Sequence, residues 1–214
     1  MKPTRPRCLF VDIGGVLLTD GWNHHARRRA ARHFKLPAAE LENRHRLVFE
    51  AFEDGRLTLD DYLRLVVFHQ KRPFRRAEFR SFMFAQSELC PGMIELVTRL
   101  KQRYRLKVVV VSNEGRELNA RRIRRFGLAR FVDSFISSCF VHVRKPDAAI
   151  FRMALDVAQV QPSEVVYIEN TALFVEIGES LGLRCVLHTD LKSTRARLAA
   201  LGLRDDGDVR QAVR

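Results

Sequence analysis

The sequence feature that most constrains the fold is a short apolar run that ends in one carboxylate. Residues 8–11 (CLFV) lead directly into Asp12, and Gly14 and Gly15 follow before the apolar residues resume. Such a run, rich in Phe and Val and broken by two glycines, is typical of a strand buried on both faces and followed by a tight turn. Asp12 should therefore lie at the carboxyl end of a central strand, where open α/β sheets bind their ligands.

Three later apolar runs also lead into polar residues. Helical patterns separate these runs, and strand alternating with helix predicts a parallel sheet, whose carboxyl ends share one edge. A buried carboxylate is costly without a partner, so Asp12 should meet a cation there. The runs are 108–111 before Ser112 and Asn113, 141–143 before Arg144 and Lys145, and 165–168 before Glu169 and Asn170.

Taken in order, a nucleophilic Asp, a Ser, a Lys and an acidic pair resemble the motifs of the haloacid dehalogenase superfamily of hydrolases. The resemblance extends over about residues 8–201. It implies an α/β fold, with a Rossmann-like parallel sheet as the core and a helical C1-type cap inserted after the first strand. The opening resembles that of a phosphatase subgroup that carries Asp-x-Gly-Gly.

The resemblance assigns a role to each strand-end residue. Asp12 would attack phosphorus and form an acyl phosphate that water later cleaves. The Ser112 hydroxyl and the backbone amides of Ile13 and Asn113 would bind phosphoryl oxygens, and Lys145 would neutralise the charge. Catalytic residues are then Asp12, Ser112 and Lys145, and substrate-binding residues are Ile13, Ser112, Asn113 and Lys145.

Each assignment has a structural alternative. Asp12 could be a buried carboxylate that accepts hydrogen bonds from turn amides, and Ser112 could be the N-cap of a helix that begins over residues 113–116. Lys145 could be an ordinary surface lysine. Its place between a predicted strand and a helix with Pro146 in the first turn favours the functional role.

A magnesium site is implied by the same resemblance. Mg²⁺ prefers oxygen ligands, and Asp12, the Gly14 carbonyl, Glu169 and Asn170 would supply them. The family usually has two carboxylates where this chain has Glu169 and Asn170, and the missing charge should weaken the metal. The structural alternative is a Glu-Asn turn at a strand end.

Gly14 is the larger departure from the family pattern. Typical phosphatases of the family carry Asp there as general acid and base, a contribution worth on the order of 10²–10⁴ in rate. Replacement candidates are Asp20, His24 and His25, although the histidines also fit an exposed first helical turn and Asp20 fits a helix cap. Dehalogenases carry an aromatic at this position and need no metal, so Gly14 together with Glu169 argues against dehalogenation.

Helical periodicity replaces the strand pattern between about Gly21 and Ser87. We expect a core domain of residues 1–20 and 88–214 and a helical cap domain of residues 21–87. Gly202 to Arg214 should be a frayed tail. The candidate helices are 23–34, 38–52, 59–70 and 75–85, and the candidate substrate contacts on them are Phe49, Phe52, Arg56 and Tyr62.

Charge and targeting signals limit the function classes. The chain has 38 Lys and Arg against 25 Asp and Glu, a net charge of +13 that could attract nucleic acid. The densest basic runs, 27–32 and 121–125, fit solvated helix faces without interleaved aromatics, so this pattern argues against nucleic-acid binding. No membrane-spanning run occurs, and Asp12 interrupts the only signal-like stretch, so a cytoplasmic protein is expected.

The sequence therefore predicts a magnesium-dependent phosphatase that cleaves a small phosphorylated metabolite through an aspartyl phosphate on Asp12. Because Gly14 and Asn170 both remove catalytic charge, the alternative is a slow or inactive relative that binds a phosphorylated ligand or a protein partner. The oligomeric state and the substrate have no signal in the sequence.

Overall fold

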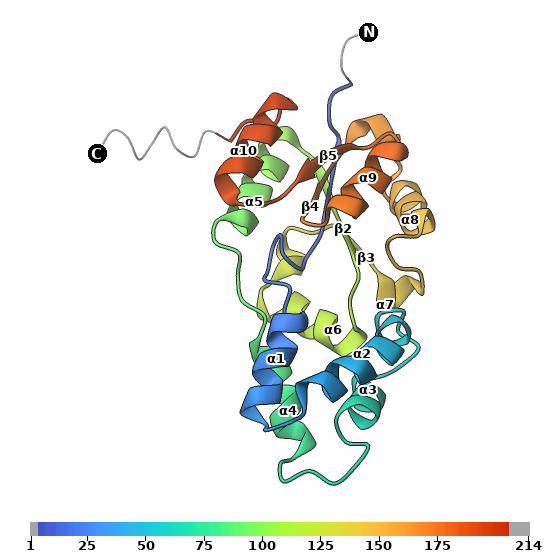
Figure 1. Cartoon of the computed structure of the whole chain (residues 1–214). Coiled ribbons are helices and arrows are strands. Elements are labelled where there is room, and N and C mark those ends of the chain that lie inside the picture. Colours follow the sequence, from blue (N-terminus) through green and yellow to red (C-terminus); the bar gives the residue numbers. More distant parts are fainter. Residues whose placement is uncertain (1–3, 206–214) are drawn as a thin grey trace, which may run out of the picture.

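The computed structural model describes residues 4–205, in which one sheet of five parallel strands forms the centre of the main domain (Figure 1). The strand order is β3-β2-β1-β4-β5, so the strand that leads into Asp12 is the central one. The predicted α/β fold with a Rossmann-like parallel core is thus confirmed. The strands are β1 (Cys8–Val11), β2 (Lys107–Ser112), β3 (Ser134–Ser137), β4 (Val165–Glu169) and β5 (Arg184–Leu187).

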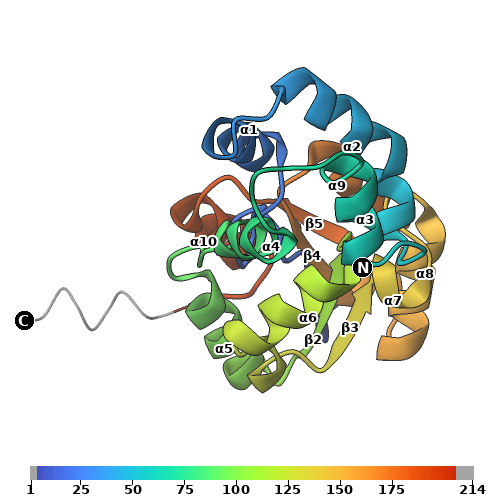
Figure 2. The same ribbon diagram turned by 90° about the horizontal axis from the view of Figure 1, so that it is seen from below.

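The two faces of the sheet are covered by different helices (Figure 2). Leu9 and Val11 pack with α5 (Met93–Tyr104) and α10 (Leu191–Ala200), whereas Cys8 and Phe10 pack with α8 (Ala148–Ala158) on the other face, where α9 (Ala172–Ser180) also lies. Successive strand residues point to opposite faces, so a central strand covered on both sides must be apolar throughout. This explains why the run before Asp12 shows no polar alternation.

A helical lobe lies at the carboxyl end of the sheet, at the bottom of Figure 1. It has its own apolar cluster, which includes Trp22, Tyr62 and Phe79. Two of its helices begin at residue types that commonly cap helices: the Asn23 side chain accepts from the Ala26 amide, and the Thr58 side chain accepts from the amide of Asp61. The helices of the lobe are α1 (His24–His33), α2 (Ala38–Glu53), α3 (Leu59–Val66) and α4 (Arg76–Ala85).

Two linkers, residues 18–22 and 86–90, join the helical lobe to the main domain and run side by side. The Thr19 amide donates to Glu88 O (2.9 Å), and the Cys90 amide donates to Leu17 O (3.0 Å). The Thr19 hydroxyl adds a bond to Gln86 O at 3.1 Å. None of the helices within residues 4–205 is both long and apolar enough to span a membrane.

Two sequence predictions about local structure are wrong. Residues 141–143 form no strand, because the chain enters α7 (Ser138–Val141) directly after β3; Val141 and Val143 are apolar because they pack against the core. The expected frayed tail is packed at its start, since Leu203 is buried in the core. Residues 206–214 lie outside the described part of the chain.

Candidate active site

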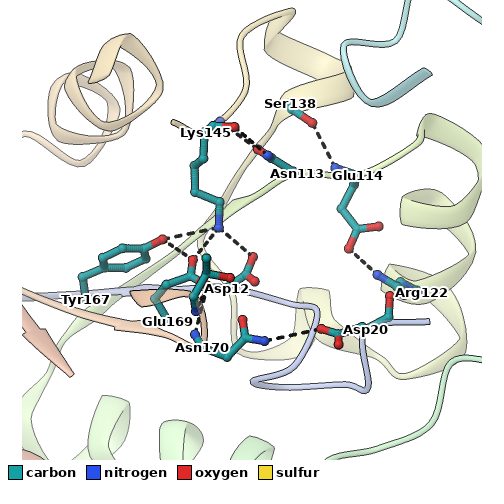
Figure 3. Close-up of polar contacts among 11 residues, drawn as sticks. Asp12, Asp20, Asn113, Glu114, Arg122, Ser138, Lys145, Tyr167, Glu169 and Asn170 are labelled. Carbon is teal, nitrogen blue, oxygen red and sulfur yellow. Dashed lines mark hydrogen bonds and ion pairs between the residues drawn. The ribbon is translucent and has the colours of Figure 1, made fainter. Parts of the chain in front are cut away.

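Asp12 lies immediately beyond β1 and is 7% exposed (Figure 3). Its amide donates to Ile168 O (3.1 Å), which continues the pairing of β1 with β4 by one residue. The register Val11↔Ile168 therefore sets Asp12 beside Glu169, the last residue of β4. Two carboxylates are brought together at the edge where the strands end.

Lys145 is the predicted cation and is 1% exposed. Its Nζ lies 3.2 Å from Asp12 Oδ1, 2.5 Å from Glu169 Oε2 and 3.3 Å from the Tyr167 hydroxyl. Burial alone would lower the pKa of Lys145, but Asp12 and Glu169 raise it above its ordinary value, so the amine stays charged. Tyr167 also donates to Glu169; it was not predicted because it reads as an ordinary core residue of a strand.

The Asp12 carboxyl is strongly perturbed. Burial and then the charge of Glu169 raise its pKa to about 7, against the opposing effects of Lys145 and of a hydrogen bond from Ser112. Raised proton affinity on a carboxylate beside a buried lysine is typical of functional sites. The structure thus brings Asp12, Ser112, Lys145 and Glu169 together.

Asn113 holds the backbone of Lys145 in place. Its Nδ2 donates to Lys145 O, and its Oδ1 accepts from the Lys145 amide, both at 2.8 Å. The backbone amides of Asn113 and Ile13 are engaged by no other backbone group among residues 4–205, so both remain available to an anion. Ser112 is the last residue of β2 and not a helix N-cap.

The helices that follow these loops begin later than expected. Helix α6 (Arg116–Arg125) begins after Gly115, three residues beyond Ser112. Helix α8 begins at Ala148 with Asp147 as its N-cap, so Pro146 precedes the helix instead of occupying its first turn. Both differences leave a longer irregular loop for the polar residues at the sheet edge.

Three oxygen-bearing groups meet beside Asp12, and together with it they fit the implied Mg²⁺. The Asn170 amide oxygen points toward Gly14 O (3.1 Å) and Glu169 Oε1 (2.9 Å), positions from which an amide nitrogen, after a 180° turn, would donate to both. Asp12 Oδ1 is buried and accepts no well-directed hydrogen bond. Either a turned Asn170 amide or a hard cation would stabilise these facing oxygens.

The donor set has only two carboxylates. No group of three or more His, Cys, Asp and Glu side chains within residues 4–205 is arranged to hold a metal. Gly15 is required beside this set, because it has φ +74° and a Cβ there would lie 2.0 Å from Asn170 Nδ2.

Glu114 and Arg122 form a buried ion pair that sequence reasoning missed. They are 4% and 5% exposed, and the guanidinium donates directly to the carboxylate. Burial raises the pKa of Glu114, and Arg122 opposes this effect. The expectation that arginines 121–125 are solvated is therefore wrong for Arg122, whose side chain turns inward from α6 to meet Glu114.

Arg122 also ties both linkers to α6. Its Nη2 donates to Asp20 O and its Nε donates to the Ser87 hydroxyl, both at 2.9 Å. Gly21 has φ +68°, and a Cβ there would lie 1.8 Å from Arg122 Nη2. The glycine therefore makes room for the guanidinium.

A cleft of about 390 Å³ opens between the helical lobe and the main domain on this side of the linkers. Of the candidate substrate contacts, Phe49 and Phe52 line this cleft, whereas Arg56 binds Asp54 and Tyr62 is buried behind Phe52. We call it the leaving-group cleft. Its lining consists of Asp20, Trp22, Asn23, His24, Arg27, His45, Phe49, Phe52, Glu53, Asn113, Glu114, Gly115, Leu118 and Arg122. A larger hollow, about 980 Å³, lies between α1 and α4 and contains none of the strand-end residues.

Comparison with known proteins decides the family. A model of the haloacid dehalogenase-like hydrolases matches residues 6–182 of the chain. The chain is a haloacid dehalogenase-like hydrolase. The resemblance inferred from the four strand-end motifs is confirmed, and the enzyme class is that of a hydrolase of this family.

This hydrolase is similar to one curated phosphatase and to solved structures of the same fold. A phosphorylated carbohydrates phosphatase of Thermotoga maritima is 28% identical over 82% of this chain and 81% of its own. A predicted haloacid dehalogenase-like hydrolase of Porphyromonas gingivalis has a TM-score of 0.74 at 17% identity and covers 94% of this chain and all (100%) of its own. An enzyme of the family from Bacteroides thetaiotaomicron, solved with magnesium and inorganic phosphate, has a TM-score of 0.72 at 16% identity and covers 86% of this chain and 95% of its own.

The structure also shows what surrounds Gly14 in this hydrolase. A Cβ on Gly14 would lie 3.7 Å from Asp20 Oδ1 and 3.9 Å from Arg122 Nη1. Of the acid–base candidates, Asp20 and His24 line the leaving-group cleft, whereas His25 faces the larger hollow between α1 and α4. Asp20 does not cap α1, since Asn23 does, but its carboxylate accepts from the Asn23 amide (3.2 Å).

Proposed function

We propose that this hydrolase cleaves phosphomonoesters of small carbohydrates through an aspartyl phosphate on Asp12, with Mg²⁺ as cofactor. The observation that carries the proposal is the contact of Lys145 Nζ with both Asp12 and Glu169 at the end of the central strand. The name of the Thermotoga maritima relative supports the carbohydrate class. The helical lobe would act as the cap domain, residues 21–87, over the core of residues 1–20 and 88–214.

The chain's own residues supply the groups that the reaction needs. Asp12 would attack phosphorus as the P–O bond to the sugar breaks, and the sugar oxygen would leave as it takes a proton from water in the cleft. A second water would then cleave the acyl phosphate, release inorganic phosphate and regenerate the carboxylate. Lys145 and the Ser112 hydroxyl would bind the phosphoryl oxygens together with the free amides of Ile13 and Asn113. Asn113 would contribute further by holding the Lys145 backbone.

Asp12, Gly14 O, Glu169 and Asn170 would hold Mg²⁺. When bound, the ion neutralises phosphoryl charge and orients the group for in-line attack. Because one position of the usual acidic pair is an amide, we expect activity to need more Mg²⁺ than an enzyme with two carboxylates would. The chelator EDTA should abolish the activity, and added Mg²⁺ should restore it.

The test is the variant Asp12→Asn assayed with 4-nitrophenyl phosphate and Mg²⁺. We expect a loss of at least about 10³-fold in kcat with the same thermal unfolding profile, because the amide cannot form the acyl phosphate. Asp156→Asn, the same chemical change on the exposed surface of α8, should keep wild-type activity. A fully active Asp12→Asn would overturn the mechanism, and a folded wild-type chain without activity or Mg²⁺ affinity would favour a binding protein that has lost catalysis.

A further inference from the structure

The leaving-group cleft has a charge pattern that the proposed phosphoryl site, formed by Asp12, Ser112, Lys145 and the backbone amides of Ile13 and Asn113, does not need. Its lining includes the carboxylates Asp20, Glu53 and Glu114 and the guanidiniums Arg27 and Arg122. Whether these guanidiniums can bind a second anionic group of a substrate depends on whether their donors are already used. The contacts of each answer this.

Arg27 is saturated by groups of the helical lobe. Its Nε and Nη2 donate to the two carboxylate oxygens of Glu42 (2.7 and 2.6 Å), and its Nη1 donates to Trp22 O (2.7 Å). Bidentate pairing of this kind is strong and leaves little charge for another anion. Arg27 therefore offers the cleft no free cation.

Arg122 is saturated as well, by Glu114 and by the two linker contacts with Asp20 O and Ser87. Each of its three nitrogens thus has a partner. Glu114 is the only one of these partners that carries a charge, so it alone neutralises Arg122. Without that carboxylate, a buried guanidinium would face the cleft unpaired.

The two remaining carboxylates of the lining differ, because Glu53 is paired with Arg144 (2.8 Å) and Asp20 is not. The Asp20 carboxylate binds the neutral amides of Asn23 and Asn170 (3.2 and 3.4 Å) and forms no ion pair among the described residues. Burial and then Arg27 lower the pKa of His45 to about 4, so its ring is neutral at physiological pH. His24 is exposed at the start of α1, with its ring 3.8 Å from that of His25.

The aromatic part of the lining suits an uncharged ring or chain. Phe49 and Phe52 come from α2, and Trp22 comes from the first linker, where its indole N–H donates to the Tyr62 hydroxyl (2.8 Å). Phe52 packs so closely on Gly115 that a Cβ there would lie 2.2 Å from its ring. Aromatic faces beside carboxylates are suited to the C–H faces and hydroxyl groups of a sugar.

We propose that Glu114, by neutralising Arg122, restricts this hydrolase to phosphomonoesters whose leaving group is uncharged and hydroxyl-bearing, and excludes substrates with a second phosphate or a carboxylate. The inference rests on the proposed phosphatase function. Glu114 is a positioning residue here, because it acts through Arg122. Among the described residues that line the cleft, neither Arg27 nor Arg122 has a guanidinium free for a second anion, which would also meet the carboxylate of Asp20.

The test compares kcat/KM for glucose 6-phosphate and glucose 1,6-bisphosphate at saturating Mg²⁺. The assays are run at pH 8, where an unperturbed histidine is mostly neutral. The wild type should prefer the monophosphate by at least about tenfold, since like charge and missing cations both disfavour the bisphosphate. In Glu114→Gln this preference should fall at least about tenfold, with an absolute gain for the bisphosphate, because Arg122 is then uncompensated.

Two controls separate this effect from general damage. Glu114→Asp keeps the charge and should keep the preference, and Glu176→Gln, the same change on the exposed surface of α9, should leave both rates unchanged. Equal wild-type rates on the two sugars, or an equal loss on both in Glu114→Gln, would overturn the inference while leaving the phosphatase proposal intact. If the folded wild type hydrolyses no phosphate ester, not even 4-nitrophenyl phosphate, the proposed function itself is overturned.

A second measurement covers the case in which Glu114→Gln does not fold. Glucose 1,6-bisphosphate is then tested as an inhibitor of wild-type hydrolysis of 4-nitrophenyl phosphate. We expect an inhibition constant at least about tenfold higher than that of glucose 6-phosphate. An equal or lower constant would show that the cleft accepts a second phosphate and would contradict the assignment.

Discussion

The phosphoryl site and the leaving-group cleft lie side by side but are built in different ways. In the proposed phosphoryl site, Asp12, Ser112 and Glu169 lie at or just beyond the ends of adjacent parallel strands, so the register of the sheet fixes them, as the pairing of β1 with β4 fixes Asp12 beside Glu169. Lys145 comes from the loop after α7, where Asn113 holds its backbone. The cleft is made where linkers, α6 and the helical lobe meet, and its main ion pair joins Glu114 to Arg122 across a loop and a helix. The first site would set the chemistry and the second the substrate.

The largest effect is expected at Lys145, which belongs to the phosphoryl site and not to the cleft. Lys145→Met should abolish activity on every phosphate ester by about 10³-fold or more and should lower the free energy of unfolding by about 3–5 kcal/mol, because two buried carboxylates lose their cation. Activity on glucose 6-phosphate and 4-nitrophenyl phosphate should fall alike, unlike the selective effect expected at Glu114. Steady-state rates and urea unfolding check both parts. A variant with unequal losses would show that the two sites are not separate.

A gain is expected at Asn170. Asn170→Asp adds a carboxylate beside Gly14 O and Glu169, so the concentration of Mg²⁺ that gives half-maximal activity should fall about tenfold, near 1.4 kcal/mol in affinity. The preference between glucose 6-phosphate and its 1,6-bisphosphate should not change. Titration calorimetry with Mg²⁺ alone gives a readout without turnover. Weaker Mg²⁺ binding in this variant would argue against Asn170 as a ligand.

The smallest expected effect concerns the stability of the cleft wall at His45. Burial lowers the pKa of His45 in the folded protein to about 4 from an ordinary 6.5. As the pH falls below 6.5, the unfolded chain therefore binds a proton at this residue that the folded chain does not bind. Stability should therefore decline from pH 6.5 to pH 4 by about 1–3 kcal/mol on account of this residue and level off below that. His45→Gln should remove this part of the decline in urea unfolding at pH 7.5 and pH 4.5. His25→Gln, at an exposed position on the same lobe, should not.

The sequence predicts the phosphoryl site far better than the cleft. Asp12, Ser112 and Glu169 each follow a strand, and a parallel sheet brings the carboxyl ends of its strands to one edge, so their convergence follows from local patterns. Lys145 reaches the same edge from a loop. Tyr167 lies inside the apolar run of β4, so the sequence pattern does not distinguish it from the core residues beside it. The segment before Lys145 resembles a strand because Val141 and Val143 are apolar. These valines contact the core and do not pair in the sheet.

Glu114 and Arg122 could not be predicted from local patterns. Arg122 lies in a run of arginines, and helical periodicity alone does not show which of them turns inward. Its direction depends on the linkers, and these depend on how the lobe docks onto the main domain. In the sequence, the one sign of an inward side chain is Gly21 itself, and a glycine at a domain boundary can equally well serve a turn or a hinge.

The position of Trp22 gives this hydrolase an internal optical probe. It is the single tryptophan of the chain, and its indole lies in the first linker with a defined partner in the lobe. Occupancy of the leaving-group cleft by a sugar, or a shift of the lobe, should alter the emission of this one fluorophore. Ligand association could thus be followed in real time on the unlabelled protein, even with the nucleophile removed.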